Sequence, residues 1–458
     1  MKFSSTTIAK RLLPILFVVA FLKTSAQSDL ASPYTIFGPG ISNLRQTVSM
    51  AGAGGSGVAL TDPYKLNFAN PASVAYHAEP IFESSGKYVN STFSTNLGSF
   101  DNNSFELNNI NISFPIIRGK WGLIVGLLPY TTIGYEVTTV ADDEEVEIQP
   151  LSQYSGDGGI SQGYLGMGYK FYDKVDSAGN VTAIAFGANV NYNFGTLNAE
   201  RMNYFPFDTE ARGVKSEESI LVKDWSVDFG VHYQKNIIKR SISNPRYLKF
   251  LAGLSYSLKS DLTTERNEFA YTFTGTSGLS LSDTLRFSDR EEGSIILPER
   301  YTLGVGLDYV STQKTRLRFS ADYTLERWSE YGVSYNDDNL GFNFQDRQRY
   351  SAGLEYTPKL GSNKYFETVE YRAGFHYDRS NLNLRNKDIE DIGMSFGLTL
   401  PIHHRRAITQ SSFSIGAVYG KNGTQEMGLI QEDYIRIFVG FSFTPHFRNK
   451  WFVQPKYD

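Results

Sequence analysis

Large apolar side chains recur at every second residue in many segments of this 458-residue chain. Between Tyr301 and Tyr309 the residues that separate them are small or polar, and residues 225–233, 319–326 and 435–443 follow the same pattern. Successive side chains of a strand point to opposite faces, so each segment has one apolar face and one polar face. A soluble sandwich would bury the apolar face, whereas a membrane barrel turns it toward lipid and keeps the polar face inside.

Composition excludes several other classes of protein. Hydrophobic residues make up 41% of the chain and the mean hydropathy is −0.31, which excludes a bundle of transmembrane helices. The absence of Cys excludes a disulfide scaffold, a Cys-ligated metal site and thiol catalysis. Disordered chains are poor in aromatic residues, whereas this chain has 4 Trp, 29 Tyr and 32 Phe.

Three features favour the barrel over the sandwich. Aromatic residues lie at the ends of the apolar faces, as an interfacial girdle requires. Connections between segments alternate in length, the long ones being residues 140–160, 199–217, 267–295 and 331–346. The polar faces carry full charges and one alternating His, namely Arg318, Asp322, Glu326, Glu355, Glu370, Arg372, His376, Asp378 and Arg436.

We therefore expect an all-β, antiparallel transmembrane barrel of about 14 strands over residues 79–445. The polar wall of its lumen would include Arg318, Asp322, Glu326, Glu355, Arg372, His376 and Arg436. Bacterial barrels of this type have an even number of strands and short periplasmic turns, which would place both termini in the periplasm of a Gram-negative bacterium.

Residues 1–26 have the pattern of a secretory signal peptide. A basic start precedes an apolar run, Leu12 to Leu22, that is too short to span a bilayer, and small residues end at Ala26. An N-terminal anchor helix is the alternative. Removing the four basic residues of this segment from the 44 in the chain leaves 40 against 48 acidic ones, a net charge of −8 that argues against nucleic acid as a partner.

Residues 27–78 do not alternate and are rich in Gly, Pro and Asn. The stretches Gly54–Pro63 and Asn67–Ser73 resemble the opening motif of the long-chain fatty acid transporter (FadL/TodX) family. That resemblance implies a 14-stranded barrel whose N-terminal segment folds into the lumen as a hatch. It also implies passage of hydrophobic small molecules, with a sideways exit at a kinked third strand. The hatch residues would include Gly54, Gly55, Gly57, Asp62, Pro63, Asn70 and Pro71.

The sequence style, including the tail of residues 446–458, resembles Bacteroidetes members of this superfamily. Those members include putative transporters and barrels of the type IX secretion system. A hatch needs glycines for close packing and prolines for turns, and its backbone groups need polar partners on the lumen wall. The alternative to a hatch is a plain plug that only fills space.

Pro129 lies inside the third predicted strand, Lys120 to Thr139, where it has no N–H for the ladder. In the resembled family the lateral opening is at a kink in this strand, so we predict that Pro129 marks the corresponding opening. A proline at the lip of the strand without a functional gap is the alternative, because prolines collect at strand ends.

Candidate catalytic and metal sites are weak. His376 alternates with Arg372 and Asp378, and His232 with Asp228, but no nucleophile accompanies them, and we expect no enzymatic activity. Residues 52–57 fit the dinucleotide fingerprint without the strand and helix that it requires, so no cofactor is expected. The acidic run of residues 142–147 could bind Ca²⁺ and bridge lipopolysaccharide, but charge runs are usually solvated loops. His403–Arg406 reads as a solvated turn, so no metal site is assigned.

Two functions remain open. The first is an outer-membrane channel for passive uptake of hydrophobic or amphipathic small molecules, gated by the hatch. The second is a barrel of the same fold that binds a protein partner in a secretion or surface assembly. A polar interface between hatch and wall, without a continuous apolar pocket, would favour the second. An apolar pocket near the outer loops would favour the first.

Overall fold

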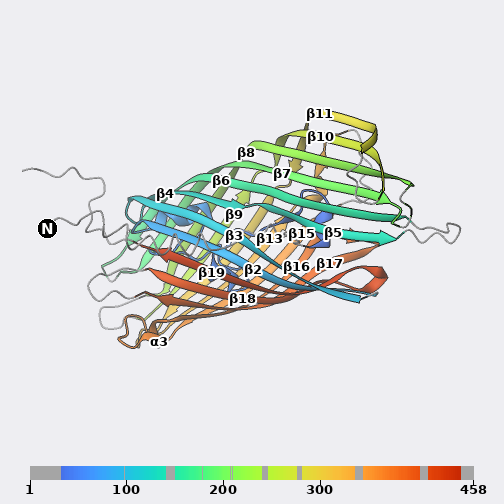
Figure 1. Cartoon of the computed structure of the whole chain (residues 1–458). Coiled ribbons are helices and arrows are strands. Elements are labelled where there is room, and N and C mark those ends of the chain that lie inside the picture. The colour runs from blue at the N-terminus through green and yellow to red at the C-terminus, as the bar shows by residue number, and fades with distance from the viewer. Residues whose placement is uncertain are drawn as a thin grey trace, which may run out of the picture.

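The computed structural model describes residues 32–96, 98–140, 150–177, 179–206, 208, 210–239, 246–275, 281–335, 344–402 and 411–444. Its strands form a closed 14-strand antiparallel barrel (Figure 1), which confirms the predicted fold class. The ring closes where the last strand pairs with the first, from Gln431 opposite Ser94 to Phe443 opposite Phe82. Among the described residues, no helix combines the length and hydropathy that a membrane-spanning helix needs.

Eleven of the barrel strands are single elements and three are divided by a kink. The single elements are β2 (Ile81–Thr95), β3 (Gly98–Ile117), β6 (Leu151–Val175), β7 (Val181–Tyr204), β8 (Arg212–Ile238), β13 (Arg316–Glu326), β15 (Arg347–Thr357), β16 (Glu370–Leu384), β17 (Lys387–Pro401), β18 (Ser412–Gly423) and β19 (Gln431–Phe443). The divided strands are β4 (Trp121–Pro129) with β5 (Thr131–Val140), β9 (Tyr247–Ser257) with β10 (Ser260–Thr274), and β11 (Leu281–Leu297) with β12 (Arg300–Val310).

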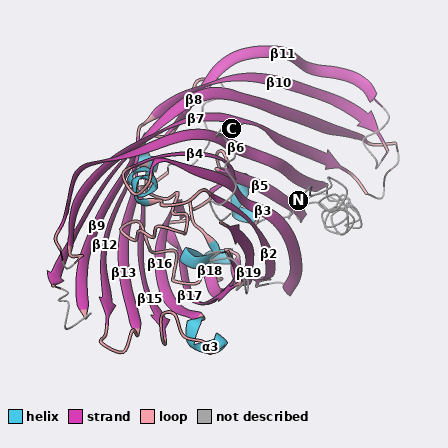
Figure 2. Ribbon diagram, turned by 90° about the vertical axis from the view of Figure 1, so that its left-hand side faces the viewer, coloured by secondary structure: helices cyan, strands magenta, loops and turns pink. Residues whose placement is uncertain are grey.

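The remaining elements are short. Inside the ring lie η1 (Pro33–Ile36), β1 (Ile41–Ser42), α2 (Val48–Ala51) and η2 (Pro71–Tyr76), all from the N-terminal part of the chain. The connections between barrel strands carry η3 (Trp328–Glu330), β14 (Gly332–Val333), α3 (Tyr365–Thr368) and η4 (Glu426–Gly428). Figure 2 shows helices and loops enclosed by the strands.

Because side chains alternate along each strand, the apolar ones point outward and the polar ones point into the lumen. On β12 the side chains of Leu303, Val305 and Leu307 are exposed, whereas Asp308 on the other face is buried. The exposed apolar faces form the lipid-facing surface of a membrane barrel, and the buried polar faces line its lumen.

Much of the sequence that we expected to form long connections is strand. The ladder between β6 and β7 extends to Leu151 opposite Tyr204, and the ladder between β8 and β10 extends to Arg212 opposite Thr274. The segment Ser282–Glu292, for example, has only Leu285 and Phe287 as apolar residues, so the alternation that predicts a strand is weak there. The long predicted connections 199–217 and 267–295 were therefore wrong in most of their length.

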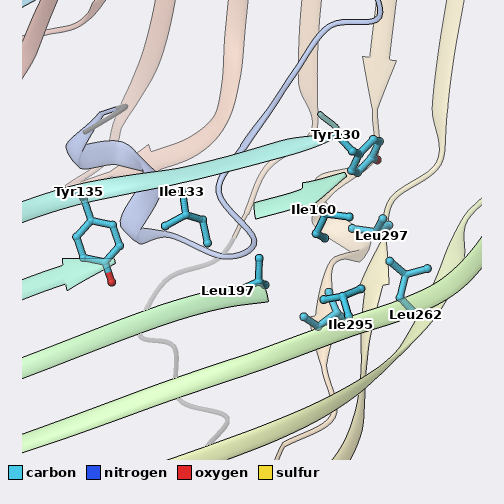
Figure 3. Close-up of a cluster of buried hydrophobic side chains, with 9 residues drawn as sticks. Tyr130, Ile133, Tyr135, Ile160, Leu197, Leu262, Ile295 and Leu297 are labelled. Atoms are coloured by element: carbon cyan, nitrogen blue, oxygen red, sulfur yellow. The ribbon is translucent and has the colours of Figure 1, made fainter. Parts of the chain in front are cut away.

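These extensions form an outer lobe, which consists of β5, β10, β11 and β14 with residues 151–160, 195–204 and 212–222. β8 changes partner along its length, pairing with β9 at Asp228–Ile238 and with β10 at Arg212–Val222. Glycines allow strands to bend where the lobe leaves the ring: Gly159 has a φ of +142°, and a Cβ there would lie 2.3 Å from the carbonyl oxygen of Thr131. The inner faces of the lobe share a buried apolar cluster (Figure 3), which includes Tyr130, Ile133, Ile160, Leu197, Leu262 and Ile295.

Candidate functional site

The N-terminal part of the chain, residues 33–78, runs through the lumen; we call it the luminal segment. Near one end of its path, β1 pairs with β5, with Ile41 opposite Thr132 and Ser42 opposite Thr131. At the other end the N–H of Gly119, in the turn between β3 and β4, donates to the carbonyl oxygen of His77 at 2.8 Å. The segment thus spans the interior from the outer lobe to the short turn before β4.

Glycines of the luminal segment lie directly against the backbone of the wall. Gly54 has a φ of +73° and its N–H donates to Ser395 Oγ at 2.7 Å. A Cβ on Gly54 would lie 2.5 Å from the carbonyl oxygen of Phe375, so no larger residue fits without a shift of β16. Gly55 and Gly57 also have positive φ, of +81° and +143°. The structure places all three in the lumen, in conformations that favour glycine.

Asp322 of β13 holds the turn that follows these glycines. Its Oδ2 accepts hydrogen bonds from the N–H groups of Gly57 at 2.7 Å and Val58 at 2.9 Å. Two backbone donors that the segment cannot pair internally are satisfied in this way by one buried carboxylate. On the same strand Ser320 Oγ lies 2.7 Å from Ser56 Oγ, so a second contact fixes the turn to β13.

Asp62 and Pro63 stand near charged residues of the wall. Asp62 Oδ2 lies 3.6 Å from Arg316 Nη1 and 3.7 Å from Arg318 Nη1. Burial alone would raise the pKa of Asp62, but nearby cations, led by Lys65, outweigh burial and hold that pKa below its ordinary value. The carbonyl oxygen of Pro63 accepts from the N–H of Ala78, which ties the turn to the end of the segment.

Asn70 and Pro71 begin η2, the helix that packs against the wall. The Oδ1 of Asn70 caps the helix by accepting from the N–H of Ala72 at 3.0 Å, and its Nδ2 donates to the carbonyl oxygen of Val231 at 3.1 Å. Pro71 occupies the first helical position, where its missing N–H costs nothing. A Cβ on Gly187 of β7 would lie 2.3 Å from Pro71, so a small wall residue makes room for the helix.

The predicted polar wall is buried and joined in networks. One network contains Arg318, Glu355 and Arg372, with 3.1 Å between Arg318 Nη1 and Glu355 Oε1 and 2.8 Å between Arg372 Nε and Glu355 Oε2. It continues through Glu370, which pairs with both Arg372 and Lys65 of the luminal segment. The wall and the segment are therefore connected by charge as well as by hydrogen bonds.

A second network joins Glu326 to cations on both of its sides. Arg300 Nε lies 2.9 Å and Arg347 Nη1 lies 3.5 Å from Glu326 Oε1. Arg347 and Arg349 also pair with Asp378, at 2.6 and 3.0 Å. Arg300 donates to Ser42 Oγ, so this network also contacts the luminal segment.

His376 and Arg436 belong to a third group around Asp391. His376 Nε2 lies 3.5 Å from Asp391 Oδ1 and 3.3 Å from the hydroxyl of Tyr434. Arg436 lies 4.0 Å from Asp391 and stacks on the ring of Tyr434, at 3.7 Å from its centroid. Each member has a structural partner, which is what a closely packed polar lumen requires.

Arg45 of the luminal segment also contacts the wall, and it was not identified from the sequence. It pairs with the buried Asp228 of β8 and donates to Gln162 Oε1 at 2.6 Å. The sequence feature that could have identified Arg45 is its position as the first basic residue after residue 26, within a stretch rich in Gly, Pro and Asn. His232, which the sequence placed with Asp228, bonds instead to the hydroxyl of Tyr76 and the carbonyl oxygen of Ala59.

The third strand changes partners at Pro129. β4 pairs with β3 from Trp121 to Leu127 and with β6 as far as Pro129 opposite Ser161. After the kink, β5 continues beside β6, and its other edge carries β1 of the luminal segment. In the described residues the ladder between β3 and the third strand ends at Ile110 opposite Leu127, and Figure 1 shows β5 diverging from β3.

A cavity of about 160 Å³ lies beside this divergence. It is lined by the luminal segment, by β3 and β5, and by charged wall residues that include Arg347, Arg349 and Asp378. Two further cavities along the segment measure about 70 and 50 Å³. A site for a drug-sized ligand usually has roughly 300–1,000 Å³ and a mostly apolar lining.

No group of three or more His, Asp or Glu is placed to hold a metal ion within the part of the chain that the structure describes. The acidic run of residues 142–147, the turn His403–Arg406, the segment 1–26 and the tail 446–458 lie outside that part.

We expect protonation of His77 to weaken the seating of the luminal segment as the pH falls from about 6.5 toward 4. Burial lowers the pKa of His77 to about 4, although Asp62 opposes this shift. A released segment takes up this proton near pH 6.5 and the seated one does not, so seating loses on the order of 3 kcal/mol across the window. Protease protection of residues 33–78 between pH 8 and 4 measures the effect. His77→Gln should flatten the profile, and identical profiles for both proteins would contradict it.

The geometry defines a membrane-spanning β-barrel whose lumen holds the N-terminal part of its own chain. The chain belongs to the BamG family, whose model matches residues 8–458. No curated protein sequence matches it significantly.

Solved structures with this fold include a FadL homologue from Pseudomonas aeruginosa. It is 13% identical, with a TM-score of 0.52 over 89% of this chain and all of the other. The toluene transporter TodX of Pseudomonas putida is 14% identical, with a TM-score of 0.50 over the same shares. At these identities the likeness establishes the fold alone.

Proposed function

We propose that this protein is a plugged outer-membrane barrel that binds a protein partner in an outer-membrane assembly. The observation that supports this most directly is the charged, closely packed interface between the luminal segment and the wall. The cavities along that interface are small, about 160 and 70 Å³, whereas an uptake path for hydrophobic molecules needs a continuous apolar route.

Displacing the luminal segment would separate buried charges. Arg45 would leave Asp228, Lys65 would leave Glu370, and Asp62 would leave Arg316. Removing one partner of a buried ion pair costs about 3–5 kcal/mol, because the other charge stays buried without compensation. The segment therefore acts as a fixed plug in this proposal rather than as a hatch that opens at each transport event.

The apolar outward faces support a position of the barrel in lipid, and lipopolysaccharide would surround its outer end in this proposal. The turn 118–120 and the start of β2 lie at the same end of the barrel as the last described residue, Thr444. In the proposed orientation this end faces the periplasm, and the outer lobe projects from the opposite surface.

A second candidate function is passive movement of small hydrophobic or amphipathic molecules, with an exit beside Pro129. The specific observation in its favour is the end of the ladder between β3 and the third strand at Leu127. The cavity beside β3 and β5 would then be the last compartment before the exit. TodX, which shares the fold, is named as a toluene transporter.

Native mass spectrometry separates the two functions. The protein would be purified from its own outer membrane in mild detergent and transferred with its contents intact. We expect a protein partner in fixed stoichiometry and a lumen without a small molecule. A reproducibly bound hydrophobic molecule, with no protein partner, would overturn the proposal and support transport.

A disulfide that locks the luminal segment to the wall should leave the protein fully functional. Ser56 and Ser320 have hydroxyls 2.7 Å apart, and the chain has no Cys of its own to interfere. In Ser56→Cys/Ser320→Cys, oxidation should leave partner retention and the uptake of amphipathic dyes within twofold of the reduced protein. A tenfold or greater fall in uptake on oxidation, reversed by reductant, would show a moving hatch. Each single-Cys variant, treated with the same oxidant, is the control.

A further inference from the structure

We infer that the edge of β3 at Asn103–Leu107 is a docking site for an extended basic segment of a partner protein, which would add to the wall as a strand on the side of β3 that faces β5. This inference rests on the proposed function, that the barrel binds a protein, and it names the place and the chemistry of the contact.

The first support is the regular shape of this edge. β3 pairs with β2 without a break from Asn103 opposite Asn90 to Leu107 opposite Gly86. On the side that faces β5, no described strand pairs with residues 103–107, because the ladder with β4 runs only from Ile117 to Ile110. A straight strand edge of this kind is a template for another strand.

The second support is that the edge of β5 that faces β3 already pairs with a strand. β1 of the luminal segment pairs with β5 at Thr131 and Thr132, and the N–H of Ser32 donates to the carbonyl oxygen of Gly134 at 3.0 Å. The kink after Pro129 therefore exposes backbone groups that extended chain can satisfy. Toward β3 the luminal segment makes a different contact: the bulged residue Asn108 donates from its side chain to the carbonyl oxygen of Gln46 at 3.1 Å.

The third support is that the inward face of this edge borders a cavity and its outward face is exposed. Ser104, Glu106 and Asn108 line the cavity of about 160 Å³, together with Thr132 of β5. On the outward face Phe105 is 65% exposed and Leu107 is 43% exposed. A strand added here would place alternate side chains into the cavity and against Phe105, which gives such binding its specificity.

The charge of the two edge strands indicates the chemistry of the partner segment that would bind there. Residues 98–109 and 131–140 contain Asp101, Glu106 and Glu136 and neither Lys nor Arg. Lys87 of β2 pairs with Glu106 at 3.0 Å, which leaves the two edge strands acidic in sum. A second copy of this chain would bring the same acids together, whereas a segment with Lys or Arg between apolar residues complements them.

Photo-crosslinking in the intact outer membrane tests the inference. A photoreactive phenylalanine analogue would replace Phe105 in the full-length protein, and the same analogue at Phe319, an exposed position on β13, is the control. We expect a protein adduct at position 105, whose linked peptide is rich in Lys or Arg, and lipid adducts alone at position 319.

Charge reversal supplies the second readout. Asp101→Lys/Glu136→Lys should lower the adduct yield at least fivefold, whereas Asp261→Lys/Asp289→Lys, two exposed acids of the outer lobe, should leave it within twofold. Heat-modified electrophoretic mobility confirms that each variant is folded.

The outcomes separate the site from the function. A protein partner that copurifies but yields only lipid adducts at position 105 would overturn the strand site and leave the proposed function standing. A linked peptide that is acidic, or an equal loss of yield in both charge variants, would also overturn the site. Absence of any protein partner would overturn both.

Discussion

Replacing Gly54 by Ala is expected to release the luminal segment from the lumen. A Cβ at this position would lie 2.5 Å from the carbonyl oxygen of Phe375 and 2.8 Å from that of Ala352. Both atoms belong to the backbone of paired barrel strands, so they cannot move aside as a flexible side chain would. Crowding of this kind costs about 1–3 kcal/mol, to which the φ of +73° adds about 1 kcal/mol for a residue with a Cβ.

Limited proteolysis of the intact barrel measures the release, because residues 33–78 become cleavable once they leave the lumen. Single-channel conductance should rise at the same time. Gly361→Ala is the matched control: its φ is +70°, close to that of Gly54, but no atom lies within 4 Å of the added Cβ. Equal cleavage in both variants would show that contact of Gly54 with the wall does not control the seating of the segment.

The part of the barrel that faces lipid could be predicted from the sequence. In that part the lipid outside and the polar lumen inside differ most, so β12 carries Leu303, Val305 and Leu307 on one face and Asp308 on the other. Pro129, which was predicted to mark an opening inside the third strand, is the residue at which β4 ends in the structure.

The outer lobe could not be predicted from the sequence, because its strands lack the regular contrast between an apolar face toward lipid and a polar face toward the lumen. Strands made mostly of polar residues, such as Ser282–Glu292 of β11, are held by their neighbours in the sheet. The pairing of Arg45 with Asp228 is invisible for another reason, since the two residues are 183 positions apart and lie on a loop and a strand. Sequence patterns report local periodicity, whereas the partner of a luminal charge depends on how the whole ring closes.

The roles of the glycines and prolines in the luminal segment could be predicted only in part. The sequence shows that the backbone between Gly54 and Pro71 needs turns and close approaches, but it does not show against what. The structure supplies the partners, among them Ser395 for Gly54 and Asp322 for Gly57. Of these two, Asp322 was identified in the sequence as part of a polar wall, although its specific partner was not.

Replacing Arg372 by Met should destabilise the barrel and the seated segment together. Arg372 donates to Glu355 Oε2 at 2.8 Å and to Thr399 Oγ1 at 2.6 Å, and it also pairs with Glu370. Met keeps much of the volume but leaves these carboxylates with fewer cations in a buried site. Breaking a buried ion pair from one side costs about 3–5 kcal/mol.

The temperature at which the folded barrel loses its compact electrophoretic mobility should therefore fall clearly in Arg372→Met, and residues 33–78 should become cleavable below that temperature. Arg327→Met is the control, because Arg327 pairs with Glu299 and Glu330 at the exposed surface, where ion pairs contribute little. If Arg372→Met behaved like Arg327→Met, the charge networks would not hold the segment, and packing of glycines against the wall would be its main attachment. The comparison with Gly54→Ala then helps to decide between the two, because that substitution adds a Cβ against the wall and removes no charged group.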